Sequence, residues 1–256
     1  MVARPHPPKV VGIIDSVPAC GEGWTSAPAG GRVAVGVASP EDVIEAKRRL
    51  RRAVLARAAE AASARRGAAG RAVCRLLAGL PEVRRAAVVM AFVATAQEVD
   101  TWPLIRWAWA EGKQVAVPRI VPAEGGGRVA DSPSGPLGGA MEAVLLQPAD
   151  AASPAEHPAL APDRFGILTA PSAPAVPVET IDLVLVPCAA VDRLGNRLGK
   201  GGGYYDRFLA RPEVRAVRIA VAFREQVVDR VPVGPHDVPV DMVVTDAEVL
   251  RFRRRG

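Results

Sequence analysis

Residues 181–209 read IDLVLVPCAAVDRLGNRLGKGGGYYDRFL, and this stretch is the starting point for interpreting the whole chain. It begins with aliphatic residues at 181–186, a pattern typical of a buried strand, and passes through a polar turn into glycines at 199 and 201–203. A helix is expected to follow from about Tyr204. A strand, a glycine loop and a helix in this order place backbone N–H groups and a helix N-terminus around one anion. The stretch therefore predicts a phosphate site.

The charged side chains of the same loop favour a nucleotide phosphate. Arg197 and Lys200 add cations, and Asp206 adds a carboxylate suited to a metal ion. The loop is not the GxxxxGK[ST] motif, because no Ser or Thr follows the lysine, and it does not match the GxGxxG fingerprint. A flexible turn is the alternative interpretation of a lone triple glycine. The two cations and the helix that follows weigh against that interpretation.

The remaining patterns alternate between strands and helices. Strands are expected at 86–93, 114–117, 217–223 and 240–244, with a helix at 101–111. Ser39 and Pro40 predict the start of a helix that runs to about residue 66, where Gly67 ends it, and a second helix at 70–80. Repeated strand–helix–strand units predict an α/β fold: an open, mostly parallel, Rossmann-like sheet flanked by helices in three layers.

The expected organisation is an irregular N-terminal extension at 1–40 and a single α/β domain at 41–256. Residues 121–180 are the least regular part, with ordered pieces expected only at 143–146 and 165–168. In open α/β sheets, ligands bind beyond the carboxyl ends of the strands. Glu98, Arg119 and the glycine loop all follow such ends, and the residues at 251–255 are expected to form a solvated basic tail.

Composition limits the classes of function. No apolar run approaches the roughly 20 residues that span a bilayer, and the N-terminus does not resemble a signal peptide. The cysteines Cys20, Cys74 and Cys188 show no metal or disulfide spacing, which favours a reducing cytoplasm. The net charge of +6 suits either a basic enzyme with polyanionic substrates or an RNA-binding module. Few aromatic residues accompany the basic ones to stack bases, so nucleic acid is not the expected partner.

Several residues look ordinary when spacing alone is considered. Lys47 and Arg51 lie one turn apart on the first helix, where a solvated face is the simpler interpretation. Asp237 resembles an ordinary turn acid. No histidine stands at a telling spacing from Cys188, so a catalytic cysteine is not predicted.

The motifs become specific when they are taken together. The run LGNRLGKGGGYYDRFL, after a strand that ends in Pro187, resembles the signature of the 5-formyltetrahydrofolate cyclo-ligase (methenyltetrahydrofolate synthetase) family. Further matches occur in order within roughly residues 42–247: KRRLR at 47–51, EVDT at 98–101, Gly112-Lys113 with Pro118-Arg119, FGI at 165–167, and the run at 222–241. Two departures are Cys188-Ala189 in place of the family's glycine, and Val191 in place of its phenylalanine.

The resemblance implies an activity and a set of site residues. The activity is the ATP- and Mg²⁺-dependent cyclisation of 5-formyltetrahydrofolate to 5,10-methenyltetrahydrofolate, with release of ADP and phosphate, through an iminophosphate intermediate. Catalytic roles are implied for Lys200 and Arg197, and magnesium ligation for Asp206 and Asp237. Folate contacts are implied for Val93, Glu98, Tyr204 and Tyr205; ATP contacts are implied for Lys47, Arg48, Arg51, Arg197, Leu198, Gly199, Lys200, Gly201, Gly202, Gly203, Tyr204 and Tyr205.

Two other hypotheses compete with this one. The first is a paralogue of the same fold with another nucleotide- or thiamine-related role, which retention of the full RLGKGGGYYDR run disfavours. The second is the basic RNA-binding module. The expected partners are small-molecule substrates, 5-formyltetrahydrofolate and ATP, with no membrane, and a monomer or weak dimer in the cytoplasm is expected.

Overall fold

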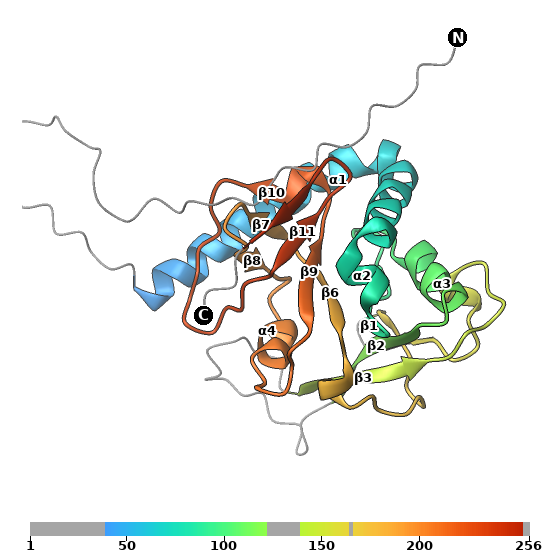
Figure 1. Ribbon diagram of the computed structural model, residues 1–256. Coiled ribbons are helices and arrows are strands. Elements are labelled where there is room, and N and C mark those ends of the chain that lie inside the picture. Colours follow the sequence, from blue (N-terminus) through green and yellow to red (C-terminus); the bar gives the residue numbers. More distant parts are fainter. Residues whose placement is uncertain (1–38, 122–138, 164–165, 253–256) are drawn as a thin grey trace, which may run out of the picture.

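A seven-stranded sheet forms the centre of the protein, whose computed structural model describes residues 39–121, 139–163 and 166–252 (Figure 1). The strand order is β12-β11-β9-β6-β1-β2-β3. Four neighbouring pairs are parallel, and only the two edge strands, β3 and β12, run antiparallel to their neighbours. The expected open, mostly parallel sheet is confirmed. The strands are β1 (Val88–Met90), β2 (Gln114–Val121), β3 (Ala140–Leu146), β6 (Leu183–Pro187), β9 (Val217–Val221), β11 (Met242–Val244) and β12 (Val249–Arg251).

Helices cover both faces of this sheet, which confirms the three-layer arrangement. The second half of α1 (Pro40–Gly79), α2 (Pro81–Arg85) and α3 (Trp102–Ala110) lie on one face, and α4 (Tyr204–Leu209) lies on the other (Figure 1). A hydrophobic core lies on each face of the sheet, and successive residues of β6 pack alternately into one core and the other. Leu183 and Leu185 pack with the first group of helices, whereas Val184 and Val186 pack with α4.

Helix α1 begins as expected but continues much further. The Ser39 hydroxyl accepts a hydrogen bond from the Asp42 N–H at 3.2 Å, and the Asp42 carboxylate accepts one from the Ser39 N–H at 2.9 Å. The predicted stop at Gly67 and the separate helix from 70 are wrong, because α1 is continuous to Gly79. An interior glycine costs about 1 kcal/mol. Burial of Val73 and Leu77, both 0% exposed, offsets that cost.

Other boundaries differ from the expected ones for local reasons. The strand expected at 86–93 begins only at Val88, because Ala86 caps helix α2. The last strand is β12 and not β11, and its end residue Arg251 pairs with Glu82 at 2.8 Å, so the tail is not solvated at that position. The predicted extension up to residue 38, Phe165, and residues 253–256 of the tail lie outside the described residues.

Smaller elements accompany the central sheet. A second sheet, ordered β10-β7-β8, contains β10 (Val227–Val228), β7 (Ala190–Asp192) and β8 (Arg197–Leu198), and β4 (Ala161–Pro162) pairs with β5 (Leu168–Thr169). Three short 3-10 helices, η1 (Pro154–Glu156), η2 (Val178–Thr180) and η3 (Arg224–Gln226), complete the described elements. The described residues 139–163 and 166–180 therefore contain more ordered elements than predicted.

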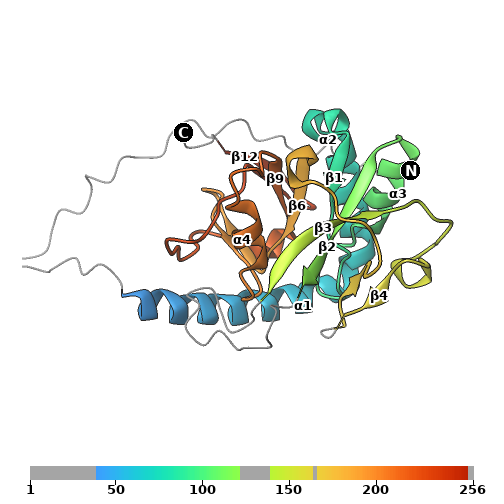
Figure 2. The same ribbon diagram turned by 90° about the horizontal axis from the view of Figure 1, so that it is seen from below.

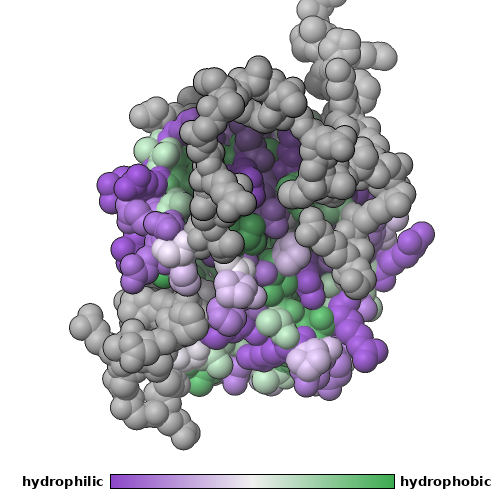
Figure 3. All heavy atoms as spheres, turned by 90° about the vertical axis from the view of Figure 1, so that its left-hand side faces the viewer, coloured by the Kyte–Doolittle hydropathy of each residue, from purple (hydrophilic) through white to green (hydrophobic). Residues whose placement is uncertain are grey.

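The N-terminal half of α1 lies against the second sheet. Val54 packs with Ala190, Leu198 and Val231, and Figure 2 shows this half of the helix extending beyond the central sheet. The described surface on this side mixes hydrophilic and hydrophobic residues (Figure 3). Within the described part of the chain, no helix combines the length and the apolar character needed to cross a membrane.

Candidate active site

A cavity of about 180 Å³ lies where the carboxyl ends of β1, β2 and β6 meet the glycine loop. This is the position at which open α/β sheets bind ligands. The lining combines apolar side chains, which we call the apolar wall (Phe92, Val93, Pro118, Ile120, Met141 and Ile167), with charged ones from the loop and from the ends of strands. The lining residues are Phe92, Val93, Thr95, Glu98, Pro118, Ile120, Met141, Asp163, Ile167, Thr169, Pro187, Arg197, Gly199, Lys200, Gly202, Gly203, Tyr204, Tyr205 and Asp206.

The glycines of the loop are required by close approach and by backbone conformation. Gly201 and Gly203 have φ angles of 113° and 63°, a region that side-chain-bearing residues rarely adopt. A Cβ added to Gly202 would lie 2.8 Å from the ring of Tyr204, and one added to Gly199 would lie 2.8 Å from Nη1 of Arg197. The loop thus brings its backbone against the cavity and leaves room for these two side chains.

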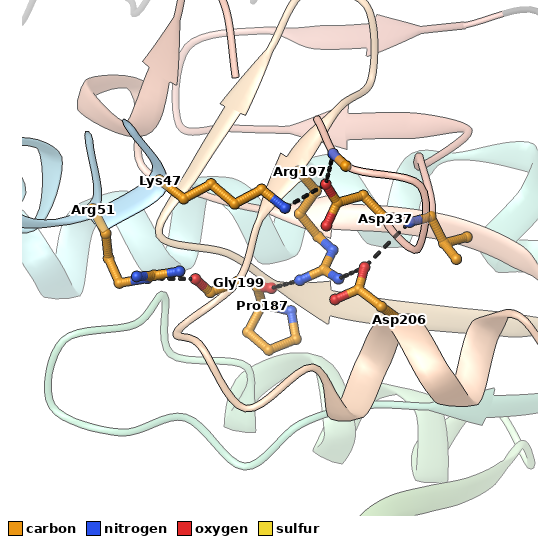
Figure 4. Close-up of polar contacts among 9 residues, drawn as sticks. Lys47, Arg51, Pro187, Arg197, Gly199, Asp206 and Asp237 are labelled. Carbon is orange, nitrogen blue, oxygen red and sulfur yellow. Dashed lines mark hydrogen bonds and ion pairs between the residues drawn. The ribbon is translucent and has the colours of Figure 1, made fainter. Parts of the chain in front are cut away.

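Arg197 is a buried cation at the base of the cavity, with 4% of its surface exposed. Its Nη2 donates to Oδ1 of Asp206 at 2.7 Å, and its Nη1 donates to the Pro187 carbonyl at 3.5 Å (Figure 4). The same Asp206 oxygen accepts the Val238 N–H at 3.2 Å. Among the described residues, Nε of Arg197 has no hydrogen-bond partner. The pair fixes helix α4 to strand β8.

Helix α1 brings two more cations to the loop. Nε of Arg51 donates to the Gly199 carbonyl at 2.9 Å, and Nζ of Lys47 pairs with Oδ2 of Asp237 at 2.5 Å (Figure 4). Burial lowers the pKa of Arg51, and the neighbouring charge of Arg48 adds to the effect. Lys47 and Arg51 therefore do not form the solvated face that spacing alone favoured, whereas the side chain of Arg48 is exposed.

An ion pair crosses the cavity between the loop and the end of β1. Nζ of Lys200 lies 2.9 Å from Oε1 of Glu98 and donates to the Thr95 hydroxyl at 3.1 Å. The other Glu98 oxygen accepts the Thr95 N–H at 2.8 Å and its hydroxyl at 2.9 Å. Glu98 is thus held rigidly by its own turn, and Lys200, whose side chain is 39% exposed, is the more mobile partner.

Two tyrosine hydroxyls add unused hydrogen-bonding capacity to the cavity. Within the described part of the chain, the buried hydroxyls of Tyr204 and Tyr205 have no partner. Burial, reinforced by Glu98, raises the pKa of Tyr205, so its hydroxyl stays protonated and can donate. Buried polar groups are normally hydrogen-bonded, so these hydroxyls are candidates for contact with a ligand.

The structure thus places most of the predicted site residues in one region. Val93 and Glu98 line the cavity together with both tyrosines, Asp206 and the predicted loop residues other than Leu198 and Gly201. Gly201 lies next to Arg51, whose Cζ would be 3.8 Å from an added Cβ. Leu198 departs from the set, because its side chain packs in the core with Val54 and its carbonyl accepts the Ala189 N–H at 2.7 Å. Asp237 lies behind the lining, on Lys47.

Cys188 does not act as a nucleophile in this arrangement. Its side chain is buried, and burial raises the pKa of its thiol to about 12. The sequence expectation of no catalytic cysteine agrees with this environment.

Sequence reasoning missed part of the apolar wall. Thr95 follows β1 and Ile120 lies near the end of β2. Their positions at the carboxyl ends of strands could have predicted both as lining residues. Met141 gave no such signal, since it lies on edge strand β3, whose pairing with β2 no short-range pattern encodes. The other missed lining residues are Phe92, Pro118, Asp163, Ile167, Thr169 and Pro187.

Comparisons with known proteins agree on one family. The model of the 5-formyltetrahydrofolate cyclo-ligase family matches residues 43–246. A 5-formyltetrahydrofolate cyclo-ligase of Escherichia coli (strain K12) is 30% identical over 175 residues, which cover 67% of this chain and 85% of that protein. The solved 5,10-methenyltetrahydrofolate synthetase of Aquifex aeolicus is 30% identical, with a TM-score of 0.64 over 82% of this chain and 94% of that one.

Two further relatives add detail. The cyclo-ligase of Mycolicibacterium smegmatis is 46% identical over 85 residues, and this match spans only 43% of that protein's length. A synthetase of Mycoplasma pneumoniae, at 17% identity and a TM-score of 0.56, shares the fold. The extent of the family match and the length of the alignment with the Escherichia coli protein show that this chain belongs to the 5-formyltetrahydrofolate cyclo-ligase family.

Proposed function

We propose that this chain is an ATP-dependent ligase that converts 5-formyltetrahydrofolate into 5,10-methenyltetrahydrofolate, releasing ADP and phosphate. The observation that carries the proposal is the single cavity that joins the glycine loop to Glu98 and the apolar wall. A phosphate bound at the loop and a planar apolar ligand against the wall would therefore meet. Membership of the cyclo-ligase family supports these two substrates.

The loop side suits the triphosphate of ATP. Backbone N–H groups of a glycine loop and a helix N-terminus bind anions, and the nearby cations Arg197, Lys200, Lys47 and Arg51 add charge. Helix α1 supplies two of these cations from outside the loop. We assign the phosphates to residues 199–203 and to these four side chains, while exposed Arg48 remains a weaker candidate.

The opposite side suits the folate. Glu98 presents carboxylate oxygens as acceptors for ring N–H groups, and Val93 and the tyrosine rings offer apolar surface. The unpartnered tyrosine hydroxyls can donate to the formyl group or to the transferring phosphoryl group. We therefore assign Val93, Glu98, Tyr204 and Tyr205 to the folate.

The proposed reaction needs no side-chain nucleophile. The formyl oxygen attacks the γ-phosphorus of ATP and ADP leaves, which converts a poor electrophile into an iminophosphate. N10 then attacks the activated carbon and loses its proton, and the C–O bond breaks to release phosphate and close the ring. Phosphoryl transfer depends mainly on positioning and charge neutralisation. Lys200, Arg197 and the loop N–H groups would provide both.

Magnesium fits this site through Asp206. Its Oδ1 is occupied by Arg197 and Val238, and Oδ2 has no hydrogen bond from the described residues. Asp237 likewise has Oδ2 occupied by Lys47 and Gly234, and its Oδ1 accepts no hydrogen bond from the part of the chain that the structure describes. Among the described residues, no group of three acids, histidines or cysteines could hold a metal alone. Mg²⁺ usually combines one or two carboxylates with phosphate oxygens and water, and it would neutralise phosphate charge there.

The proposal is tested by following the absorbance of the methenyl product. The purified chain is mixed with 5-formyltetrahydrofolate, ATP and Mg²⁺, and each component is omitted in turn. We expect product formation only in the complete mixture, with one ADP formed per product. Product formation without ATP, or its absence from the complete mixture, would contradict the proposal.

The expected cytoplasmic location and monomeric or weakly dimeric state remain predictions.

The ion pair between Lys200 and Glu98 makes a prediction about substrate binding. Because Lys200 must leave Glu98 to reach a phosphate, Glu98→Gln should release the lysine. The pair is partly exposed, through the 39% exposed side chain of Lys200, and we expect it to contribute about 1 kcal/mol, so nucleotide affinity should rise by about two- to fivefold. Affinity for 5-formyltetrahydrofolate should instead fall by about 10- to 100-fold, because a charged acceptor is lost. Calorimetry with a non-hydrolysable ATP analogue and with the folate separately measures both effects.

Glu248→Gln is the matched control, since Glu248 pairs with Arg193 at 3.0 Å and does not line the cavity. Both affinities should stay unchanged in this variant. If Glu98→Gln weakened nucleotide and folate binding together, Lys200 would not be shared between the two ligands.

Gly202→Ala tests the close approach of the loop to Tyr204. The new methyl group would lie 2.8 Å from the tyrosine ring and push it into the cavity. We expect the KM for the folate to rise by about 10- to 100-fold, as for misplacement of a positioning group. Gly79→Ala is the control, because nothing lies within 4 Å of its added Cβ. Steady-state kinetics measure the KM for the folate in both variants. Equal values in Gly202→Ala and Gly79→Ala would show that the position of the Tyr204 ring does not affect folate binding.

A further inference from the structure

Arg119 follows Pro118 on β2, and the proposed reaction assigns it no role. Its strand neighbours Pro118 and Ile120 line the cavity, whereas Arg119 does not. Successive side chains of a strand point to opposite faces, so Arg119 lies on the face away from the ligand. Its guanidinium therefore acts on the cavity only through other residues.

The guanidinium of Arg119 binds three acceptors on two different segments. Nη1 donates to the carbonyls of Pro171 and Ala173, both at 2.9 Å, and Nη2 donates to Oε2 of Glu142 at 2.8 Å. Glu142 is its cross-strand partner on β3. A planar, always charged guanidinium with several fixed donors is suited to such a three-way contact, and an ammonium group is not.

The two carbonyls belong to residues 168–176, which we call the wall segment. It begins with β5, where Thr169 lines the cavity and its hydroxyl donates to the Pro118 carbonyl at 3.0 Å. It ends along β3, where Val176 N–H donates to the Ala143 carbonyl at 2.8 Å. Between these ends Pro171 is exposed and Ala173 only partly buried. Arg119 thus holds the carbonyls of Pro171 and Ala173, next to Pro174, whose carbonyl accepts the Leu145 N–H of β3 at 2.9 Å.

We propose that Arg119 is a positioning residue that fixes the wall segment, and with it the apolar wall against which the folate binds. The proposal rests on the proposed function only for the identity of this ligand. Without Arg119, Thr169 would be held against Pro118 only by its own hydroxyl, and the segment between Thr169 and the β3 contacts would lose its side-chain anchor. The wall would open on the folate side, while the glycine loop and its cations would keep their contacts.

Arg119→Met, Arg119→Lys and Glu142→Gln separate the parts of this contact. We expect Arg119→Met to raise the KM for 5-formyltetrahydrofolate by about 10- to 100-fold, with the KM for ATP changed by less than about twofold. Arg119→Lys should restore only part of the loss, because one ammonium cannot reach all three acceptors. Glu142→Gln should have little effect, because both carbonyl contacts remain.

Arg251→Met is the matched control for a merely structural role. Arg251 lies on edge strand β12, far from β2 in the sheet, and pairs with Glu82 of helix α2 at a side-chain exposure similar to that of Arg119. It should lower stability without changing either KM. Equal changes in both KM values for Arg119→Met, or the same changes in Arg251→Met, would overturn the proposal.

Hydrogen exchange in the substrate-free protein gives a second readout that needs no activity. Amides of the wall segment should exchange at least about tenfold faster in Arg119→Lys than in the unsubstituted chain or in Arg251→Met, since exchange follows local opening. An unchanged rate would overturn the proposal even if the kinetics changed. If the unsubstituted chain formed no methenyl product, the proposed function would fail, and exchange would still decide whether Arg119 holds the wall.

Discussion

Lys200→Met is expected to lower kcat for methenyl formation by about 10²- to 10³-fold, the usual cost of removing one group that stabilises developing charge. Lys200 is the cation of the glycine loop that lies in the cavity itself, within 2.9 Å of Glu98. Methionine keeps much of the side-chain length and removes the charge. Initial rates at saturating ATP and folate measure the effect on kcat separately from binding.

Lys113→Met provides the matched control for this prediction. Lys113 donates to the carbonyls of Arg84 and Ala86 and does not line the cavity, so its loss should leave kcat unchanged. An unchanged rate in Lys200→Met would contradict the assignment of the loop to the phosphates. The other cation of the described cavity lining is Arg197, which is buried and held by Asp206 and Pro187, so it cannot take the place of Lys200.

Arg197→Met should have a large effect on both stability and catalysis. Breaking a buried ion pair by removing one partner costs about 3–5 kcal/mol, since the remaining charge is left uncompensated. Here Asp206, with 17% of its side chain exposed, would lose its 2.7 Å partner at the base of the cavity. Catalysis should fall by at least about 10²-fold through loss of a charge-stabilising group. Urea unfolding and initial rates measure the two effects.

Arg197→Lys distinguishes the two roles, because lysine keeps the charge and loses the fork that spans Asp206 and Pro187. We expect partial recovery of stability with little recovery of rate. Arg193→Met is the control, since Arg193 is 54% exposed in its pair with Glu248 and should affect neither quantity. Full activity in Arg197→Met would show that the buried arginine serves folding alone.

Local patterns predicted the central strands and the glycine loop because each is encoded within a short stretch. The alternate packing of β6 residues on two cores follows from a continuous apolar run, and the positive φ angles of Gly201 and Gly203 explain why the loop is glycine-rich. The end of α1 was predicted wrongly, because glycine propensity is a weak preference that burial of Leu77 and its neighbours outweighs.

The partners of the loop could not be derived from spacing. Lys47 reaches Asp237 across 190 residues, and Arg51 reaches Gly199 across 148, so neither contact leaves a periodic signal. Spacing alone assigned Lys47 and Arg51 to a solvated face and Asp237 to an ordinary turn. Only the family resemblance suggested otherwise. The position of Met141 depends on the pairing of β2 with β3, which is likewise a tertiary feature.

The central claim is that the γ-phosphate of ATP meets the formyl oxygen inside the cavity between the glycine loop and Glu98. The most direct measurement uses 5-formyltetrahydrofolate labelled with ¹⁸O in the formyl group and follows the label into the released phosphate by ³¹P NMR. The account predicts one ¹⁸O atom in each phosphate molecule formed with the methenyl product. Unlabelled phosphate accompanying methenyl formation would contradict it.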